Sequence, residues 1–184
     1  MTIPQLLDRA VSRHGSRDAA VFVAQNQRLS WYDLQQQADN MAAALLAMGI
    51  RRGNRVGIWS PNRLEWLLTQ FATARIGAVL VNINPAYKSS ELEYALNKVR
   101  CRMLVMARGF KTNNYLDTLR QLAPEIDRPG QAGDLTSLKL EHLKHVILLD
   151  DLSLPAHEAK PESVHRSLFL HRARFGIHRS QIPY

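Results

Sequence analysis

Histidines near the C-terminus are the first candidates for metal chemistry, because four of the seven in the chain fall within residues 157–184. They are His157, His165, His171 and His178. Their spacings of 8, 6 and 7 residues match no usual zinc arrangement, and no cysteine stands near them. We therefore predict a basic tail here, and no metal-binding residue in the chain.

Cys101 is the one cysteine, and it stands between Arg100 and Arg102. Flanking guanidinium groups can lower the pKa of a thiol and make it reactive. The alternative, which we favour, is a small core residue leading into a buried strand. A single cysteine excludes an internal disulfide and fits a reducing compartment.

Hydroxyl and carboxyl groups offer no catalytic arrangement. Ser30 is explained as a helix cap, while Glu65 and Glu91 fall in first helical turns, where a carboxylate complements the helix dipole. Neither G-x-G-x-x-G after a strand nor G-x-x-x-x-G-K-[ST] occurs. We predict no catalytic residue and no cofactor-binding residue in this chain.

A β-α-β unit at residues 54–85 organises the predicted fold. Residues 55–59 form a short apolar strand, and a helix follows with one apolar face until Gly77. That face comprises Leu64, Leu67, Leu68, Phe71 and Ala72. Residues 78–81 are a continuous apolar run, typical of a strand covered on both faces. Such a unit predicts a right-handed crossover between parallel strands.

Helices and strands also alternate on either side of this unit. The helix after Ser30 is the best specified, because Ser30 is its N-cap, Asp33 completes a capping box, and Gly49 closes it. Residues 3–14 predict a helix with Ile3, Leu6, Leu7, Ala10 and Val11 on one face. The other expected elements are a hairpin at 19–30 turning at 25–27, a helix capped by Ser89 or Ser90, strands at 103–106 and 146–149, a helix at 115–122, and a loop at 124–141.

This alternation predicts an α/β fold with a largely parallel sheet covered by helices. We assign residues 1–152 to a partial domain and residues 153–184 to an irregular tail, because the apolar periodicity fades there. The composition, 46% hydrophobic and 22% charged, is that of a globular protein. No apolar run reaches the roughly 20 residues that a membrane-spanning helix needs.

The net charge of +8 is spread along the chain. Arg51, Arg52 and Arg55 form the one tight basic group of the first part, around Gly53, and we interpret it as a solvated loop without nucleic-acid binding. Arginines in the N-terminal stretch could suggest a mitochondrial transit peptide, but Asp8 and Asp18 interrupt them. We expect a cytoplasmic protein.

Several segments resemble the AMP-forming adenylating enzymes. Residues 29–34 (L-S-W-Y-D-L) resemble the opening core motif L-[TS]-Y-x-E-L, and residues 74–85 resemble the second core motif, in which a helix passes to a strand. Residues 53–59 and 61–66 are similar to the G-D-R-V-x-I and P-N-x-x-E-W segments of acyl-CoA synthetases. Residues 110–112, 115–124 and 143–149 resemble the fatty-acyl or medium-chain branch of that family.

The resemblance implies an incomplete N-terminal subdomain of the adenylating-enzyme fold. The family activates a fatty acid with ATP to an acyl-adenylate and transfers the acyl group to CoA, using a Ser/Thr/Gly-rich loop, Mg²⁺ and a mobile C-terminal lysine. None of these features can be located here, and residues 169–184 stand where the loop is expected. The matching motifs are scaffold, so ATP, Mg²⁺ and CoA have no binding residues in this chain.

Three function classes stay open. The chain is a truncated, inactive ligase fragment, an interaction module that self-associates or docks on a full-length synthetase through a sheet edge, or a stand-alone binding domain. The third would hold its ligand near residues 60–63 and 82–87. We favour the fragment, and the divergent tail suggests a frameshift, although a genuine short gene product is the alternative.

Overall fold

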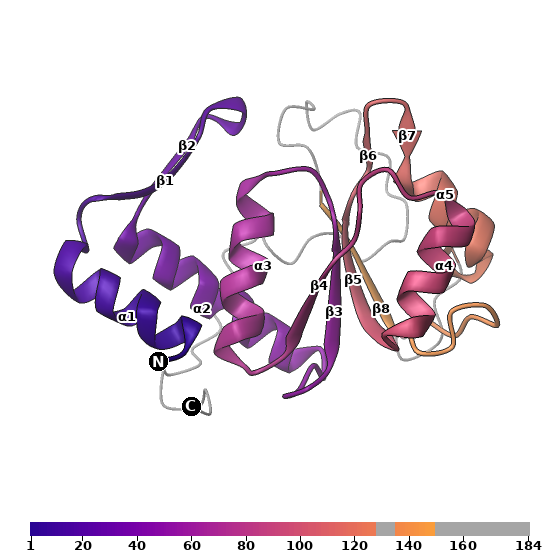
Figure 1. The fold of residues 1–184 in the computed structure, drawn as a ribbon, viewed down its shortest axis with the longest axis horizontal. Helices are drawn as coiled ribbons and strands as arrows, with labels where there is room; N and C mark the ends of the chain where they lie inside the picture. Colours follow the sequence, from indigo (N-terminus) through magenta and orange to yellow (C-terminus); the bar gives the residue numbers. More distant parts are fainter. Residues whose placement is uncertain (128–134, 150–184) are drawn as a thin grey trace. The chain divides into compact units, whose positions relative to one another are not determined.

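The computed structural model describes residues 1–127 and 135–149, which fall into two compact units (Figure 1). Among the described residues, the first unit comprises 1–53 and 62–80, and the second comprises 54–61, 81–127 and 135–149. The predicted tail at 153–184 and its four histidines lie outside the described residues.

Three helices that pack on one another form the core of the first unit. They are α1 (Ile3–His14), α2 (Trp31–Ala47) and α3 (Leu64–Arg75). The hydroxyl of Thr2 caps α1 by accepting a hydrogen bond from the Gln5 amide. Leu7 and Val11 are buried as predicted, but Ile3 and Leu6 are exposed. The apolar stripe of α1 is therefore narrower than the sequence indicated.

Strands β1 (Asp18–Phe22) and β2 (Gln27–Ser30) form the predicted antiparallel hairpin. A short 3₁₀ turn, η1 (Val23–Gln25), and Asn26 with φ of 48° join them. The capping box of α2 is confirmed, since Ser30 Oγ accepts from the Asp33 amide at 3.2 Å and Asp33 Oδ2 accepts from the Ser30 amide at 2.9 Å. Gly49 ends this helix region with φ of 77°.

The buried face of α3 is more polar than predicted. Leu64, Leu68 and Ala72 are buried, whereas Leu67 and Phe71 are half-buried. The buried residues of α3 also include the polar side chains of Thr69, Thr73 and Arg75. The two threonine hydroxyls donate to carbonyls one turn earlier, at 2.6 and 2.7 Å, so their burial leaves no hydroxyl donor unpaired.

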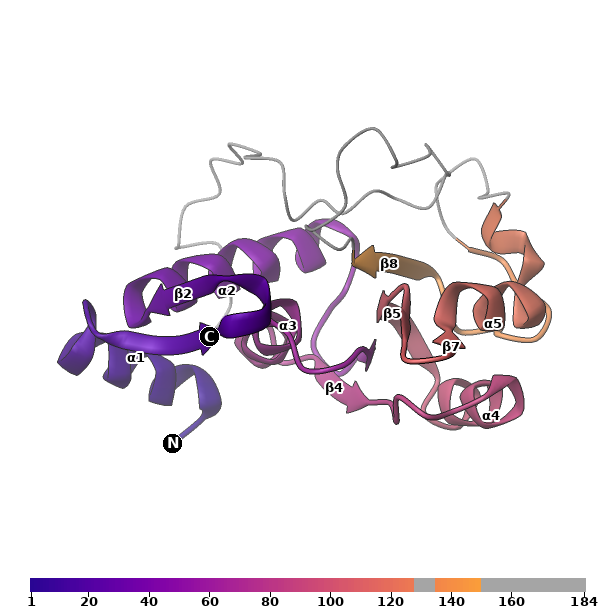
Figure 2. The same ribbon diagram turned by 90° about the horizontal axis from the view of Figure 1, so that it is seen from above.

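Four strands form a sheet in the order β4-β3-β5-β8 (Figure 1), and β4, β5 and β8 can also be found in Figure 2. Its strands are β3 (Arg55–Trp59), β4 (Val79–Asn82), β5 (Cys101–Ala107) and β8 (His145–Leu149). β5 pairs in parallel with both β3 and β8, so that Ile58, Val105 and Ile147 stand in register. The predicted α/β fold with a parallel sheet is confirmed.

Strand β4 corrects one prediction. Residues 78–81 were expected to be covered on both faces, but β4 is an edge strand with Val79 48% exposed and Leu80 and Val81 half-buried. A continuous apolar run alone does not reveal whether its strand has one neighbour or two.

Helices α4 (Ser89–Lys98) and α5 (Tyr115–Leu122) contribute the core of the second unit, together with a 3₁₀ helix, η2 (Pro124–Asp127). Leu92, Leu96 and Leu119 are among the buried residues of this core. The N-cap of α4 is Lys88, not the predicted Ser89 or Ser90. The carboxylate of Glu91, rather than a serine hydroxyl, accepts a hydrogen bond from the Lys88 amide at 2.8 Å.

A second hairpin was not predicted. Strands β6 (Gly109–Phe110) and β7 (Asn113–Asn114) pair antiparallel around Lys111, whose φ is 52°. Strands of only two residues are too short to show the alternation of apolar and polar residues by which a strand is predicted. The described part of the predicted loop at 124–141 begins with the 3₁₀ helix η2 and buries Leu135 and Leu140.

Candidate functional site

The carboxyl ends of parallel strands are where α/β folds bind ligands, and here Trp59 ends β3. Its indole Nε1 donates to the Asn84 carbonyl at 3.1 Å, and its ring stacks on that of Tyr115 with 3.8 Å between centroids. The hydroxyl of Tyr115 donates to the Pro85 carbonyl at 3.0 Å. These two aromatic residues hold the turn that follows β4, which comprises residues 84–87.

Asn113, from the unpredicted hairpin, secures the same turn. Its amide donates to the carbonyls of Pro85 and Tyr87, both at 3.2 Å, while its Oδ1 accepts from Lys88 Nζ at 3.2 Å. Asn84 Oδ1 accepts from the Ala86 amide at 2.9 Å. The polar side chains gathered here therefore bind the protein's own backbone. Burial raises the pKa of Tyr115 to about 12, which makes it a hydrogen-bond donor rather than a base.

Residues 60–63, the other part of the predicted stand-alone site, are also engaged internally. Ser60 is buried, and its hydroxyl donates to the Pro61 carbonyl at 2.9 Å. Within the first unit, the guanidinium of Arg63 pairs with Glu65 through Nε at 2.7 Å and Nη2 at 3.2 Å.

Glu65 therefore has a structural role beyond the helix dipole. Gln25 donates to its carboxylate at 3.1 Å and accepts from the Leu64 amide at 2.7 Å, so the hairpin turn caps α3. Burial alone would raise the pKa of Glu65, but the hydrogen bonds from Arg63 and Gln25 hold it below its ordinary value.

An ion cluster joins the three helices of the first unit. Arg75 on α3 binds both carboxylate oxygens of Asp8 at 2.8 and 3.0 Å, and its Nε donates to Asp39 at 2.8 Å. Gln35 donates to Asp8 at 2.6 Å. Burial would lower the pKa of Arg75, but the bonds to Asp8 and the charge of Asp39 raise it. The geometry is that of a structural clamp, since these bonds join side chains of all three helices of the unit.

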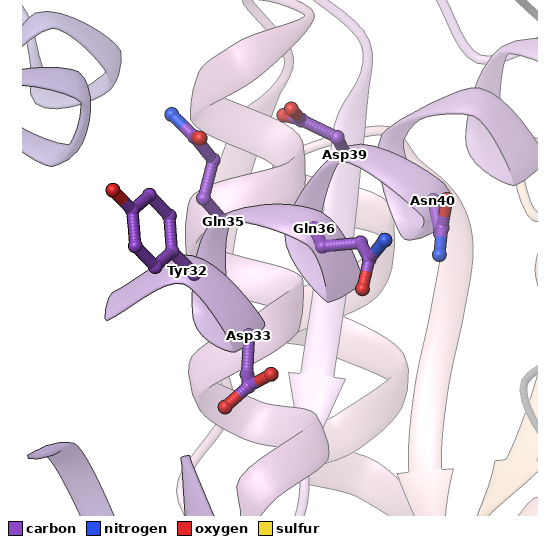
Figure 3. Close-up of a pocket in the computed structure, with 6 residues that line it drawn as sticks. All are labelled: Tyr32, Asp33, Gln35, Gln36, Asp39 and Asn40. Atoms are coloured by element: carbon purple, nitrogen blue, oxygen red, sulfur yellow. The ribbon is translucent and has the colours of Figure 1, made fainter. Parts of the chain in front are cut away.

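A shallow depression of about 340 Å³ lies along α2 in the first unit (Figure 3). It is lined by Tyr32, Asp33, Gln35, Gln36, Asp39 and Asn40. Figure 3 shows that these side chains all project from the same helix. Asp33, Gln35 and Asp39 are already bonded to Ser30, Asp8 and Arg75, so the depression is a polar helix surface rather than an organised ligand site.

Cys101 is buried, as we favoured, and its thiol donates to the Met103 carbonyl at 3.0 Å. Burial raises its pKa to about 11, which makes a reactive thiolate unfavourable at neutral pH. In residues 1–127 and 135–149, no group of three or more His, Cys, Asp or Glu side chains could hold a metal ion. No helix in the same described ranges is long and apolar enough to cross a membrane.

Sequence reasoning identified Ser30, Cys101 and the strand ends, but missed Trp59, Tyr115, Asn113 and Arg75. Two signals were available. A tryptophan ending an apolar strand needs a partner for its N–H, and an arginine inside a helix flanked by buried positions needs a carboxylate. Neither signal identifies which residue is the partner, because the partners are distant in sequence.

The family is established by direct comparison. Residues 7–171 match the model of the AMP-binding enzyme family, and the chain belongs to that family. Over 149 residues it is 44% identical to a mouse protein described as the mitochondrial medium-chain acyl-CoA ligase ACSF2. A putative acyl-CoA synthetase of Bacillus subtilis, YngI, is 35% identical over 153 residues.

These matches cover most of this chain but only a small part of each relative. They cover 81% of this chain and 24% of the mouse protein, and 83% of this chain and 28% of the Bacillus protein. The chain thus spans about a quarter of the length of these relatives.

Solved structures show the same fold. A Mycobacterium tuberculosis fatty acyl CoA synthetase matches with a TM-score of 0.67 at 21% identity, over 82% of this chain and 27% of that protein. The N-terminal domain of FACL13 from the same organism matches with a TM-score of 0.57 at 24% identity, over 58% of this chain and 27% of that structure. The chain therefore has the fold of part of the N-terminal region of adenylate-forming enzymes.

Proposed function

We propose that this chain is the N-terminal scaffold of a medium-chain or fatty acyl-CoA ligase and does not catalyse the ligase reaction by itself. The observation that carries this proposal is the 44% identity to a medium-chain acyl-CoA ligase over 149 residues, which amount to 24% of that protein. A role in fatty acid metabolism follows from the same relative.

The proposed reaction joins a fatty acid to AMP from ATP and then transfers the acyl group to CoA. Stabilising the charge on the transferring phosphate requires aligned donors or a metal ion. The chain has no Ser/Thr/Gly-rich run that resembles the family's phosphate loop. The donors at the strand ends, from Trp59, Asn113 and Tyr115, are directed at backbone carbonyls. We therefore propose that ATP, Mg²⁺ and CoA have no binding residues in this chain.

Pyrophosphate release tests this proposal. The purified chain, incubated with ATP, Mg²⁺ and octanoate, is expected to release no pyrophosphate above the level seen without the acid. A full-length acyl-CoA ligase assayed in parallel controls for the reagents. Acid-dependent release that survives removal of host synthetases, and that is absent from a mock purification, would overturn the proposal.

A second role is supported by β4. This edge strand leaves Val79 48% exposed and has one neighbour among the strands of residues 1–127 and 135–149, so its other side can pair with a further strand. We propose that β4 is the docking edge through which the chain self-associates or joins a full-length synthetase. Neither role requires nucleic-acid binding.

A stand-alone ligand-binding domain is the less favoured alternative, because the polar groups of residues 60–63 and 84–87 are already bonded within their own units.

We propose a cytoplasmic location, supported by the place of Arg9 and Arg13 on α1, which packs on α2 and α3. The mouse relative is described as mitochondrial, so imaging of the tagged chain beside a mitochondrial marker distinguishes the two locations.

A further inference from the structure

One end of α4 meets the segment that precedes β8, and a direct bond fixes the two together within the second unit. The side-chain amide of Asn97 donates to the Lys139 carbonyl at 2.8 Å. Lys98 ends the helix next to Asn97, and Leu138 precedes Lys139. The two segments can be followed beside each other in Figure 1, near the lower end of α4.

Three cations gather at this end of α4. Lys98, Arg100 and Lys139 are exposed, and within residues 1–127 and 135–149 none of them pairs with a carboxylate. Glu91 lies in the first turn of α4, at its opposite end, so the carboxylates nearer these cations in sequence are a half-buried Glu93 on α4 and an exposed Glu141 before β8. The three cations therefore leave a positive excess on this surface.

The same two segments carry two exposed apolar side chains. Leu138 is 91% exposed, the most exposed large hydrophobic residue of the described chain, and Tyr94 is 65% exposed one turn before Lys98. Lys98 Nζ lies 5.4 Å from the centre of the Tyr94 ring, so the charge and the aromatic ring form one feature. Single exposed leucines are common, but one beside an exposed tyrosine and three cations is a specific combination.

We propose that this surface, formed by Tyr94, Lys98, Arg100, Leu138 and Lys139, binds the surface of an anionic lipid bilayer. Lysines and arginines attract acidic headgroups, and leucine and tyrosine insert at the boundary between headgroups and acyl chains. The bilayer fits better than an acidic peptide, because the exposed Leu138 gains burial from acyl chains. The protein would contact the bilayer from its surface, since no helix in residues 1–127 and 135–149 is long and apolar enough to span it.

Binding to lipid vesicles tests the charge requirement. The complete 184-residue chain is mixed with vesicles of phosphatidylcholine, or of phosphatidylcholine and phosphatidylserine in equal parts, and bound protein is separated by flotation. We expect binding to the vesicles with phosphatidylserine and release at high salt. Each lysine near such a surface increases the binding constant about fivefold. The double variant Lys98→Gln and Lys139→Gln should therefore weaken binding about 20-fold.

The matched control removes two exposed charges from α1, in the first unit, through Arg9→Gln and Arg13→Gln. We expect this pair to change binding by less than about threefold, because neither arginine belongs to the proposed lipid-binding surface. Circular dichroism of both variants confirms that the surface changes leave the fold intact.

A fluorescent probe tests insertion at Leu138. Leu138→Cys carries an environment-sensitive label, and Val23→Cys, 87% exposed in the first unit, serves as the matched control. The natural Cys101 is buried with its pKa raised to about 11, so it stays unlabelled in the folded chain. The label at position 138 should brighten and shift to the blue with phosphatidylserine vesicles, while the label at position 23 should not change.

Four results would overturn the proposal. They are no binding to phosphatidylserine vesicles, equal binding to pure phosphatidylcholine, equal weakening by the two glutamine pairs, and binding without any change of the label at position 138.

Discussion

At the scale of single residues, Arg75 is the side chain on which the first unit depends most. It is 6% exposed and binds Asp8 on α1 and Asp39 on α2, so it connects α3 to both other helices. We predict that Arg75→Gln lowers the free energy of unfolding by about 3 kcal/mol, because it removes the buried guanidinium charge that pairs with the Asp8 and Asp39 carboxylates. Urea unfolding followed by circular dichroism measures this loss.

Arg13→Gln is the control for that variant, because Arg13 is exposed at the end of α1. It should change the unfolding free energy by no more than about 0.5 kcal/mol. A similarly small loss for Arg75→Gln would show that water replaces the arginine, and that the ion cluster does not hold the helices together.

Local interactions were predictable at this scale and distant ones were not. The pairing of Ser30 with Asp33 follows from their three-residue spacing. Arg75 is separated from Asp8 by 67 residues and from Asp39 by 36, so nothing in the local pattern joins them. The stacking of Trp59 on Tyr115 could not be predicted for the same reason.

At the scale of elements, β4 is an edge strand of the sheet that the described residues form. We predict concentration-dependent self-association through this edge, reduced at least about tenfold by Val79→Lys. Losing the burial of one valine costs about 1.5 kcal/mol, which corresponds to that change in Kd. Sedimentation velocity over a range of concentrations, with dye binding measured in parallel, provides the test.

Val23→Lys is the control for β4, because Val23 is exposed in η1, outside the sheet. It should leave the association constant unchanged. If the natural chain stays monomeric at high concentration and binds no dye, the docking role of β4 is wrong.

Elements with strong end signals were predicted well. α2 has a cap, a capping box and a closing glycine, and the ends predicted from these signals agree with the structure. α3 shows the limit, because Thr69 and Thr73 are polar in sequence yet buried through bonds to their own helix. The hairpin of β6 and β7 has strands of two residues without an apolar period, and it was not predicted.

At the scale of the whole molecule, the chain is an α/β part of an AMP-binding enzyme that spans about a quarter of the length of its relatives. The motifs at residues 29–34 and 74–85 were sufficient to predict the family, because they encode a capped helix and a helix-to-strand passage that the fold requires. Substrate sites could not be predicted from them, since those motifs serve the scaffold.

The central claim is that this chain folds as a scaffold without a substrate site of its own. Its most direct test is thermal unfolding of the complete chain with and without ATP and Mg²⁺. Ligand at 100 times its Kd stabilises a folded protein by about 2.7 kcal/mol, which a melting curve readily detects. We predict an unchanged Tm at millimolar ATP. A rise in Tm that increases with ATP concentration, and that is absent with inorganic phosphate, would contradict the claim.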